Sequence, residues 1–164
     1  MNKHEPRGIR NNNPLNIRYV PANDWKGRRE PKQDKDFEEF TDIEYGYRAA
    51  FILFYNYIKR GCNTIAKIIG RWAPLTENNT NLYIQRVVQE MKWPANFPLE
   101  IKDPYRMIRL AAAMVKVECG LKVVDFWSIW EGYQLFCEEY KIKMNAEKQS
   151  VEEWVLDHDA RVLT

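Results

Sequence analysis

The chain has 164 residues, enough for one domain with a substantial hydrophobic core. Its 25 basic and 23 acidic residues nearly balance, and this net charge of +2 argues against a general binder of nucleic acid. The chain has three cysteines, Cys62, Cys119 and Cys137. Their odd number argues against a disulfide framework, and the lack of a CxxC spacing argues against a zinc knuckle.

The N-terminal part of the chain is predicted to form a small β element. Residues 13–40 alternate short apolar pieces with Pro, Gly, Asn and Asp, a pattern typical of strands joined by turns and a charged loop. We expect a hairpin of two or three strands over about Asn16–Val20, Trp25–Arg28 and Phe37–Phe40.

The remainder of the chain is predicted to be helical because apolar residues recur at helical spacing. Thr41 with Glu44, and Ser150 with Glu153, have the spacing of a capping box at a helix start. The expected helices cover residues 43 to about 60, 64–72, 79–91, 103–119 and 124–140, with a short helix in the tail.

These elements predict an α+β class that is mainly helical. We expect one domain over residues 1–140 and a C-terminal tail over residues 141–164. No internal repeat or low-complexity segment divides the chain further.

Glu118 lies near the middle of the apolar stripe of its predicted helix. At about 100° per residue, Met107 lies within about 20° of it. Glu118 is also in the last turn, where the helix macrodipole disfavours a negative charge. Desolvation and the dipole both raise the pKa of a carboxyl group, which suits a general acid near neutral pH. The structural alternative is an exposed Glu118, or one paired with Arg18, Arg48 or Arg71.

The segment AAAMVKVECG, residues 111–120, resembles the catalytic helix of lysozyme-like enzymes. In goose-type lysozymes, soluble lytic transglycosylases and bacterial glucosaminidases, an apolar helix ends in Glu-Ser-Gly or Glu-Asn-Gly, and that Glu is the general acid. Cys119 stands here in place of Ser or Asn. The resemblance implies that Glu118 is the catalytic acid.

Other motifs closely resemble a family of phage and prophage proteins, often labelled virion structural proteins or phage lysozymes. The matching blocks include RGIRNNNPLNIR, FEEFTDIEYGYRA, RWAP and ENNT, and the resemblance covers about residues 7–120. Leu15 stands where the family usually has Gly. The segment from NPLNIR to FEEF is also similar to the Asn-rich hairpin that follows the acid in glucosaminidases. We therefore expect a lysozyme-like fold with circular permutation, in which an N-terminal β-hairpin and Glu118 face one groove.

The expected substrate is the glycan strand of peptidoglycan. Asn and Arg side chains suit hydrogen bonds to its N-acetyl or carboxylate groups, and an aromatic face suits stacking on a sugar. The structural alternatives to sugar binding are that the asparagines stabilise turns of the backbone and that the tryptophan packs in the hydrophobic core. The candidate substrate-binding residues are Asn13, Asn16, Arg18, Arg71, Trp72 and Tyr83.

Inverting hydrolysis needs a second carboxylate to activate water, whereas a lytic transglycosylase needs only one acid because the sugar's own hydroxyl attacks. No metal or other cofactor is expected, since His4 and His158 lack partners at ligand spacing. The candidates for a second acid are Glu30, Asp34, Asp36, Glu38 and Glu39 in the charged loop, and Glu77.

Three functions stay open. The favoured one is a phage-type enzyme that cleaves peptidoglycan, a muramidase or lytic transglycosylase. The others are a non-enzymatic virion structural protein and a module that binds glycan or protein through the same groove. Since neither a signal peptide nor a membrane-spanning stretch is recognised, we expect synthesis in the cytoplasm and no membrane insertion. Action would then be at the cell wall, or in the virion beside other virion proteins.

Overall fold

The computed structural model describes residues 4–75 and 79–159. Within these residues the regular secondary structure consists of seven α-helices, without a β-strand. The helices are α1 (Arg7–Arg10), α2 (Ile43–Lys59), α3 (Ile65–Trp72), α4 (Thr80–Met91), α5 (Pro104–Cys119), α6 (Phe126–Tyr140) and α7 (Lys148–His158).

The predicted α+β class, with its N-terminal β-hairpin, is therefore wrong. The N-terminal segment, which we define as residues 4–42, contains the short helix α1 and two isolated antiparallel bridges. One bridge joins Arg18 to Phe37 and the other joins Arg28 to Phe40. The expected strand segments thus do meet, but each pairing ends after one bridge.

Side chains explain why these pairings do not extend into strands. The Asn13 amide donates to the main-chain oxygens of Ile17 and Glu38, at 2.9 and 3.0 Å, and accepts from the Ile17 N–H at 2.9 Å. The Glu39 carboxylate accepts from the main-chain N–H groups of residues 33 and 34. The Ile17 N–H and the N–H groups of residues 33 and 34 are thus bonded to side chains and not to a neighbouring strand, whereas the Ile17 oxygen still accepts from the Glu38 N–H beside the first bridge.

The longer helices were predicted from the sequence and are confirmed, whereas α1 was not predicted. Both predicted capping boxes are wrong: Asp42 precedes α2 in place of Thr41, and α7 begins before Ser150. At four other starts a side chain accepts a hydrogen bond from the main-chain N–H three residues later, which stabilises the first turn. These capping residues are Thr64 for α3, Asn79 for α4, Asp103 for α5 and Asp125 for α6.

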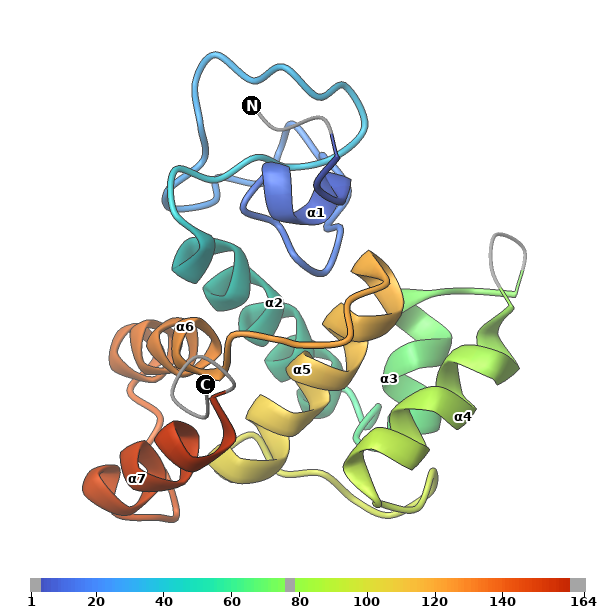
Figure 1. The fold of residues 1–164 in the computed structure, drawn as a ribbon, viewed down its shortest axis with the longest axis vertical. Helices are drawn as coiled ribbons and strands as arrows, with labels where there is room; N and C mark the ends of the chain where they lie inside the picture. Colours follow the sequence, from blue (N-terminus) through green and yellow to red (C-terminus); the bar gives the residue numbers. More distant parts are fainter. Residues whose placement is uncertain (1–3, 76–78, 160–164) are drawn as a thin grey trace.

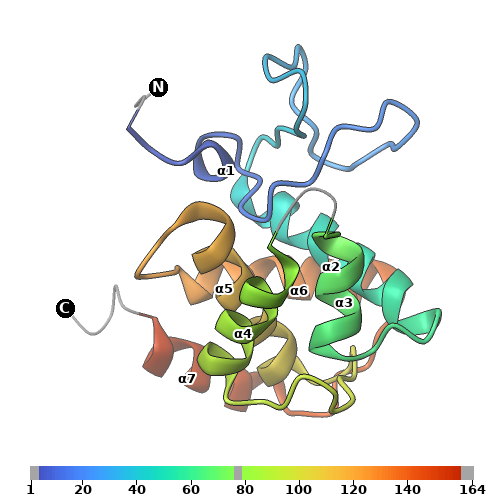
Figure 2. The ribbon, with the colours of Figure 1, turned by 90° about the vertical axis from the view of Figure 1, so that its right-hand side faces the viewer.

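Helices α2 and α6 pack closely, and Gly132 is the reason they can. A Cβ atom at Gly132 would lie 2.5 Å from the Cβ of Tyr47 on α2. Helix α5 lies beside both, α4 packs against α5 and α3, and α7 packs against α6 (Figures 1 and 2). Aromatic rings fill much of the shared core: Phe51, Phe54, Trp130, Tyr133 and Phe136 are fully buried.

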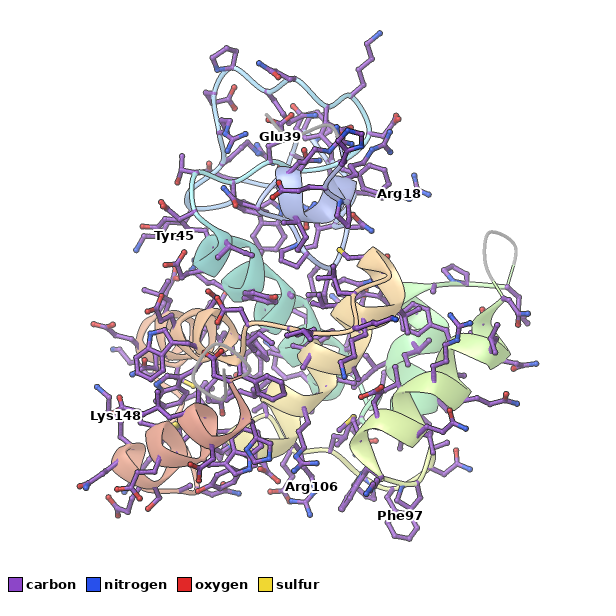
Figure 3. All side chains as sticks on the ribbon, in the orientation of Figure 1. Arg18, Glu39, Tyr45, Phe97, Arg106 and Lys148 are labelled. Atoms are coloured by element: carbon purple, nitrogen blue, oxygen red, sulfur yellow. The ribbon has the colours of Figure 1, made fainter. Side chains whose placement is uncertain are left out.

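The N-terminal segment lies over one end of this helical body, beside the start of α2 and the end of α5 (Figures 1 and 2). Arg18 and Glu39 mark it in Figure 3, whereas Phe97 and Arg106 lie at the opposite end of the molecule. Gly46 of α2 allows the close approach, since a Cβ there would lie 2.1 Å from the main-chain oxygen of Asn12. Among the described residues, no helix combines the length and apolar character needed to cross a membrane.

Candidate active site

Glu118 occupies the last turn of α5, at the end that faces the N-terminal segment (Figure 1). Helix α5 starts with Asp103 as its cap and Pro104 in its first turn. It stops at Gly120, whose φ of 63° is in the left-handed region that glycine adopts readily. A run of buried residues from Leu110 to Val115 fixes the helix in the core, so the position of Glu118 is set by a rigid element.

The Glu118 carboxyl group is held by neutral hydrogen-bond donors. The Asn16 Nδ2 group donates to Oε2 at 3.0 Å, and the Tyr83 hydroxyl donates to Oε1 at 3.1 Å. Burial is the largest influence on the Glu118 pKa and raises it. Hydrogen bonds from Asn16, Tyr83 and Trp72 lower the pKa by a smaller amount, so the net direction is upward. The group is therefore inclined to keep its proton, as a general acid must.

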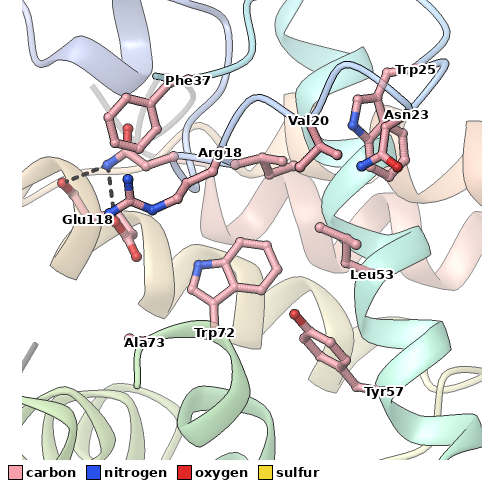
Figure 4. A pocket seen from close by; sticks show the side chains of 12 residues that line it. Arg18, Val20, Asn23, Trp25, Phe37, Leu53, Tyr57, Trp72, Ala73 and Glu118 are labelled. Atoms are coloured by element: carbon pink, nitrogen blue, oxygen red, sulfur yellow. Dashed lines mark hydrogen bonds between the residues drawn. The ribbon is translucent and has the colours of Figure 1, made fainter. Parts of the chain in front are cut away.

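A pocket of about 350 Å³ opens beside this carboxyl group (Figure 4). Its walls combine aromatic rings with a few polar groups, which is the composition that suits a sugar. The Arg18 guanidinium lies 5.4 Å from the ring centroid of Phe37, and the Trp72 ring lies 5.3 Å from that of Phe54 in the core. The lining residues are Asn16, Ile17, Arg18, Val20, Asn23, Trp25, Phe37, Leu53, Tyr57, Trp72, Ala73 and Glu118.

No protein-family model matches the chain. Over 131 residues, the chain is 36% identical to Protein P5 of Pseudoalteromonas phage PM2, and the match covers 78% of this chain and 80% of that protein. It therefore belongs to the Protein P5 family. The expected relationship to phage proteins is confirmed by this relative. The name of the relative does not mention lysozyme or peptidoglycan, so it lends no support to that narrower resemblance.

This member of the Protein P5 family brings four of the six candidate substrate-binding residues to Glu118. Asn16, Arg18 and Trp72 line the pocket, and Tyr83 contacts the carboxyl group from α4. The remaining two lie elsewhere: the amide of Asn13 is fully buried and bonded to the main chain, and Arg71 is exposed and outside the lining.

Sequence reasoning did not single out the aromatic residues Trp25, Phe37 and Tyr57 as parts of the pocket. Residues 25–40 were expected to border the groove, but the one signal for the individual rings was the number of aromatic residues in the composition. That signal does not tell a pocket ring from a core ring, because both positions favour the same side chains.

The candidates for a second acid in the N-terminal segment are engaged elsewhere. Glu38 is fully buried and forms two hydrogen bonds with Arg28, at 2.7 and 2.9 Å. Glu39 pairs with Arg29, and Asp34 accepts from Asn11 at 3.0 Å. Glu30 and Asp36 are exposed and do not line the pocket, and Glu77 lies outside the described residues. Among the residues that the structure describes, Glu118 is thus the one carboxylate in the pocket wall.

Residues 4–75 and 79–159 contain no group of three His, Cys, Asp or Glu side chains arranged to hold a metal ion. The three cysteines are free thiols. The Cys119 thiol donates to the main-chain oxygen of Pro14 at 3.2 Å, and burial together with the neighbouring Glu118 raises its pKa to about 11. Cys119 is therefore a protonated thiol near neutral pH, not a nucleophile.

Proposed function

We propose that this protein cleaves the glycan strands of peptidoglycan, with Glu118 as the general acid. The observation that carries the proposal is the Glu118 carboxyl group, whose pKa is raised by burial and which lies in the wall of an aromatic pocket. A proton donor beside a sugar-sized pocket is what cleavage of a glycosidic bond requires. The phage relative supports the proposal, because a phage must pass the bacterial cell wall.

In the proposed reaction, Glu118 gives its proton to the glycosidic oxygen while the bond from that oxygen to the anomeric carbon breaks. Since the described pocket wall offers no second carboxylate to activate water, we propose that the sugar's own primary hydroxyl group attacks the anomeric carbon. The hydroxyl proton then passes to the Glu118 carboxylate, which restores the acid. No water is consumed, and the product is an anhydro sugar end.

The pocket walls also suggest how the sugar is held. Trp72 and Tyr57 offer aromatic faces, with ring centroids 6.4 Å apart, on which a sugar ring stacks. Arg18 and Asn23 line the same pocket and offer donors to acetamido or carboxylate groups of the strand.

The test is digestion of purified peptidoglycan by the wild type and by Glu118→Gln, followed by mass analysis of the new ends. Gln keeps the shape of the side chain without the proton, so the rate should fall by about 10²–10⁴-fold. Glu90→Gln is the matched control: its carboxylate pairs with Lys116 on the surface, outside the pocket. It should digest peptidoglycan like the wild type.

Wild-type digestion by a folded Glu118→Gln variant would eliminate Glu118 as the acid. A folded wild type that leaves peptidoglycan intact would favour a non-enzymatic virion protein. Ends that carry an added water, together with loss of activity in Glu77→Gln, would replace the intramolecular attack by hydrolysis with a second acid.

A further inference from the structure

The side-chain amide nitrogen of Asn16 donates to two oxygens of a single residue, Glu118. Nδ2 lies 3.0 Å from the carboxyl oxygen Oε2 and 3.4 Å from the main-chain oxygen of the same residue. An amide nitrogen carries only two hydrogens. The two hydrogen bonds that Nδ2 donates thus both go to Glu118.

The acceptor end of the same amide is closed by Gly8. Asn16 Oδ1 is buried and accepts no hydrogen bond within the described chain. A Cβ atom at Gly8 would lie 2.9 Å from this oxygen, so the glycine of α1 packs directly against it. In the amide of Asn16, the nitrogen is therefore bonded to Glu118 and the oxygen is buried against α1, so the side chain is held by the protein itself.

The backbone sets the amide in this place without help from a ligand. Asn16 has a φ of 53°, a left-handed conformation that Asn accepts more readily than most residues. Its N–H donates to the main-chain oxygen of Asn13 at 3.0 Å, which closes the turn. The hydrogen bond from the Cys119 thiol to Pro14 ties the same turn to the end of α5. Asn16 and Glu118, which are 102 positions apart in the sequence, are thereby held in contact.

We propose that Asn16 is a positioning residue, which fixes the Glu118 side chain from the N-terminal segment and does not bind the glycan. Asn16 bonds Oε2 from the N-terminal segment, and Tyr83 bonds Oε1 from α4. The two carboxyl oxygens of Glu118 are thus held by two different elements. A carboxyl group held at both oxygens has little freedom to rotate, so it meets its substrate already oriented. This inference rests on the proposed function only where it refers to activity.

A neutral donor suits this task because it orients the acid with less stabilisation of the charged form than a cation would give. Loss of the Asn16 donor should therefore raise the Glu118 pKa further. The charged and titratable groups around the carboxyl group are Arg18 of the N-terminal segment, Tyr83 of α4 and Cys119 of α5. The Asn16 variants leave all three of these residues unsubstituted.

The experiment titrates Glu118 by carboxyl carbon NMR, with Glu118→Gln to identify the resonance. Asn16→Gly removes the amide and tolerates the left-handed backbone. Asn12→Gly is its matched control, since Asn12 has a φ of 51° but donates to the main-chain oxygens of Phe40 and Thr41. The Glu118 titration should move to higher pH in Asn16→Gly and stay at the wild-type midpoint in Asn12→Gly.

On peptidoglycan, Asn16→Gly should lower kcat by about 10–100-fold with little change in KM, because the acid is misplaced and not the substrate. Its pH–rate profile should shift upward with the titration. Asn16→Asp is the second variant, to be used if Asn16→Gly does not fold. Asp has the size of Asn and also accepts the left-handed backbone conformation. It should raise the Glu118 pKa more, since it sets a second carboxylate beside the first.

The results separate this inference from the proposed function. A raised KM with unchanged kcat and an unmoved titration would make Asn16 a substrate ligand and overturn the inference. An unmoved titration in both Asn16 variants would also overturn it. A shifted titration in a protein that cleaves no glycan would keep the positioning role and remove the proposed function alone.

Discussion

The N-terminal segment and the helical body, helices α2–α7, satisfy their main-chain polar groups in different ways. In the body, helices bond their own backbone and bury aromatic side chains between them. In the N-terminal segment, asparagine and glutamate side chains bond main-chain groups, from Glu39 to the nearby residue 33 and from Asn13 to Glu38, 25 residues away. The comparison teaches that an irregular segment can combine specific polar contacts with a few buried apolar anchors, Leu15, Ile17 and Phe40, in place of regular secondary structure. The candidate site lies where the two kinds of structure meet.

The junction between the two regions should be most sensitive at Gly46. In Gly46→Ala, the new Cβ would collide with the main-chain oxygen of Asn12, which lies 2.1 Å from its position, so the N-terminal segment must shift. We expect a loss of about 2–3 kcal/mol in the free energy of unfolding, as for an overpacked core. Hydrogen exchange should show loosened amides in the N-terminal segment and protected amides in α6.

Gly70→Ala is the control for that substitution, because nothing lies within 4 Å of a Cβ there. It should gain about 0.5–1 kcal/mol, since alanine favours a helix interior. Equal destabilisation by both variants in denaturant unfolding would contradict a specific junction at Gly46.

Within the N-terminal segment, the Arg28–Glu38 ion pair should contribute more than a pair on the surface of the body. Glu38 is fully buried, so Glu38→Ala leaves the Arg28 guanidinium without its partner. We expect a loss of about 3 kcal/mol in unfolding free energy. Glu90→Ala, which breaks the exposed pair with Lys116, should lose no more than about 1 kcal/mol. Similar losses in the two variants would show that polar contacts do not hold the segment.

The helical body has its own perturbed carboxyl group, Glu131 of α6. Burial raises its pKa most, and a hydrogen bond with Glu44 adds to the increase. The ionised group therefore destabilises the folded state at a pH above its folded pKa. Glu131→Gln keeps an oxygen acceptor for the Trp127 indole, which donates to Oε1 at 2.6 Å.

Thermal unfolding between pH 4 and pH 8 measures this effect. Glu131→Gln should be more stable than wild type near neutral pH, by on the order of 0.5–1 kcal/mol after allowance for solvent screening. The gain should shrink as pH falls through the raised pKa toward the ordinary value of 4.5. A gain that persists at the lowest pH would mean that packing, not ionisation, is responsible.

The smallest effect is expected for Cys119→Ser, at the contact of α5 with the N-terminal segment. Serine retains a donor for the main-chain oxygen of Pro14. The unfolding free energy should change by less than about 1 kcal/mol. Lytic activity should be retained, and strong loss in a stable Ser variant would reveal a role for the thiol.

The sequence determined the helices because the signals that form them are local. Apolar spacing and single capping residues such as Asp103 and Asp125 act within one or two turns, so the positions of α2 to α6 follow from the sequence alone. The same local reasoning put Glu118 on the apolar side of α5 and drew attention to it.

Only the tertiary structure decided what surrounds Glu118. Asn16 is 102 residues away, and its contact with Glu118, the closeness of Gly8 and the bond from Asn13 to the main chain of Glu38 follow from contacts that no local pattern encodes. The predicted hairpin failed for a more local reason, because the side chains of Asn13 and Glu39 bond main-chain groups four to six residues away within the same segment. The sequence thus determined the helix that carries the acid, and long-range packing decided how the acid is held and which aromatic rings form its pocket.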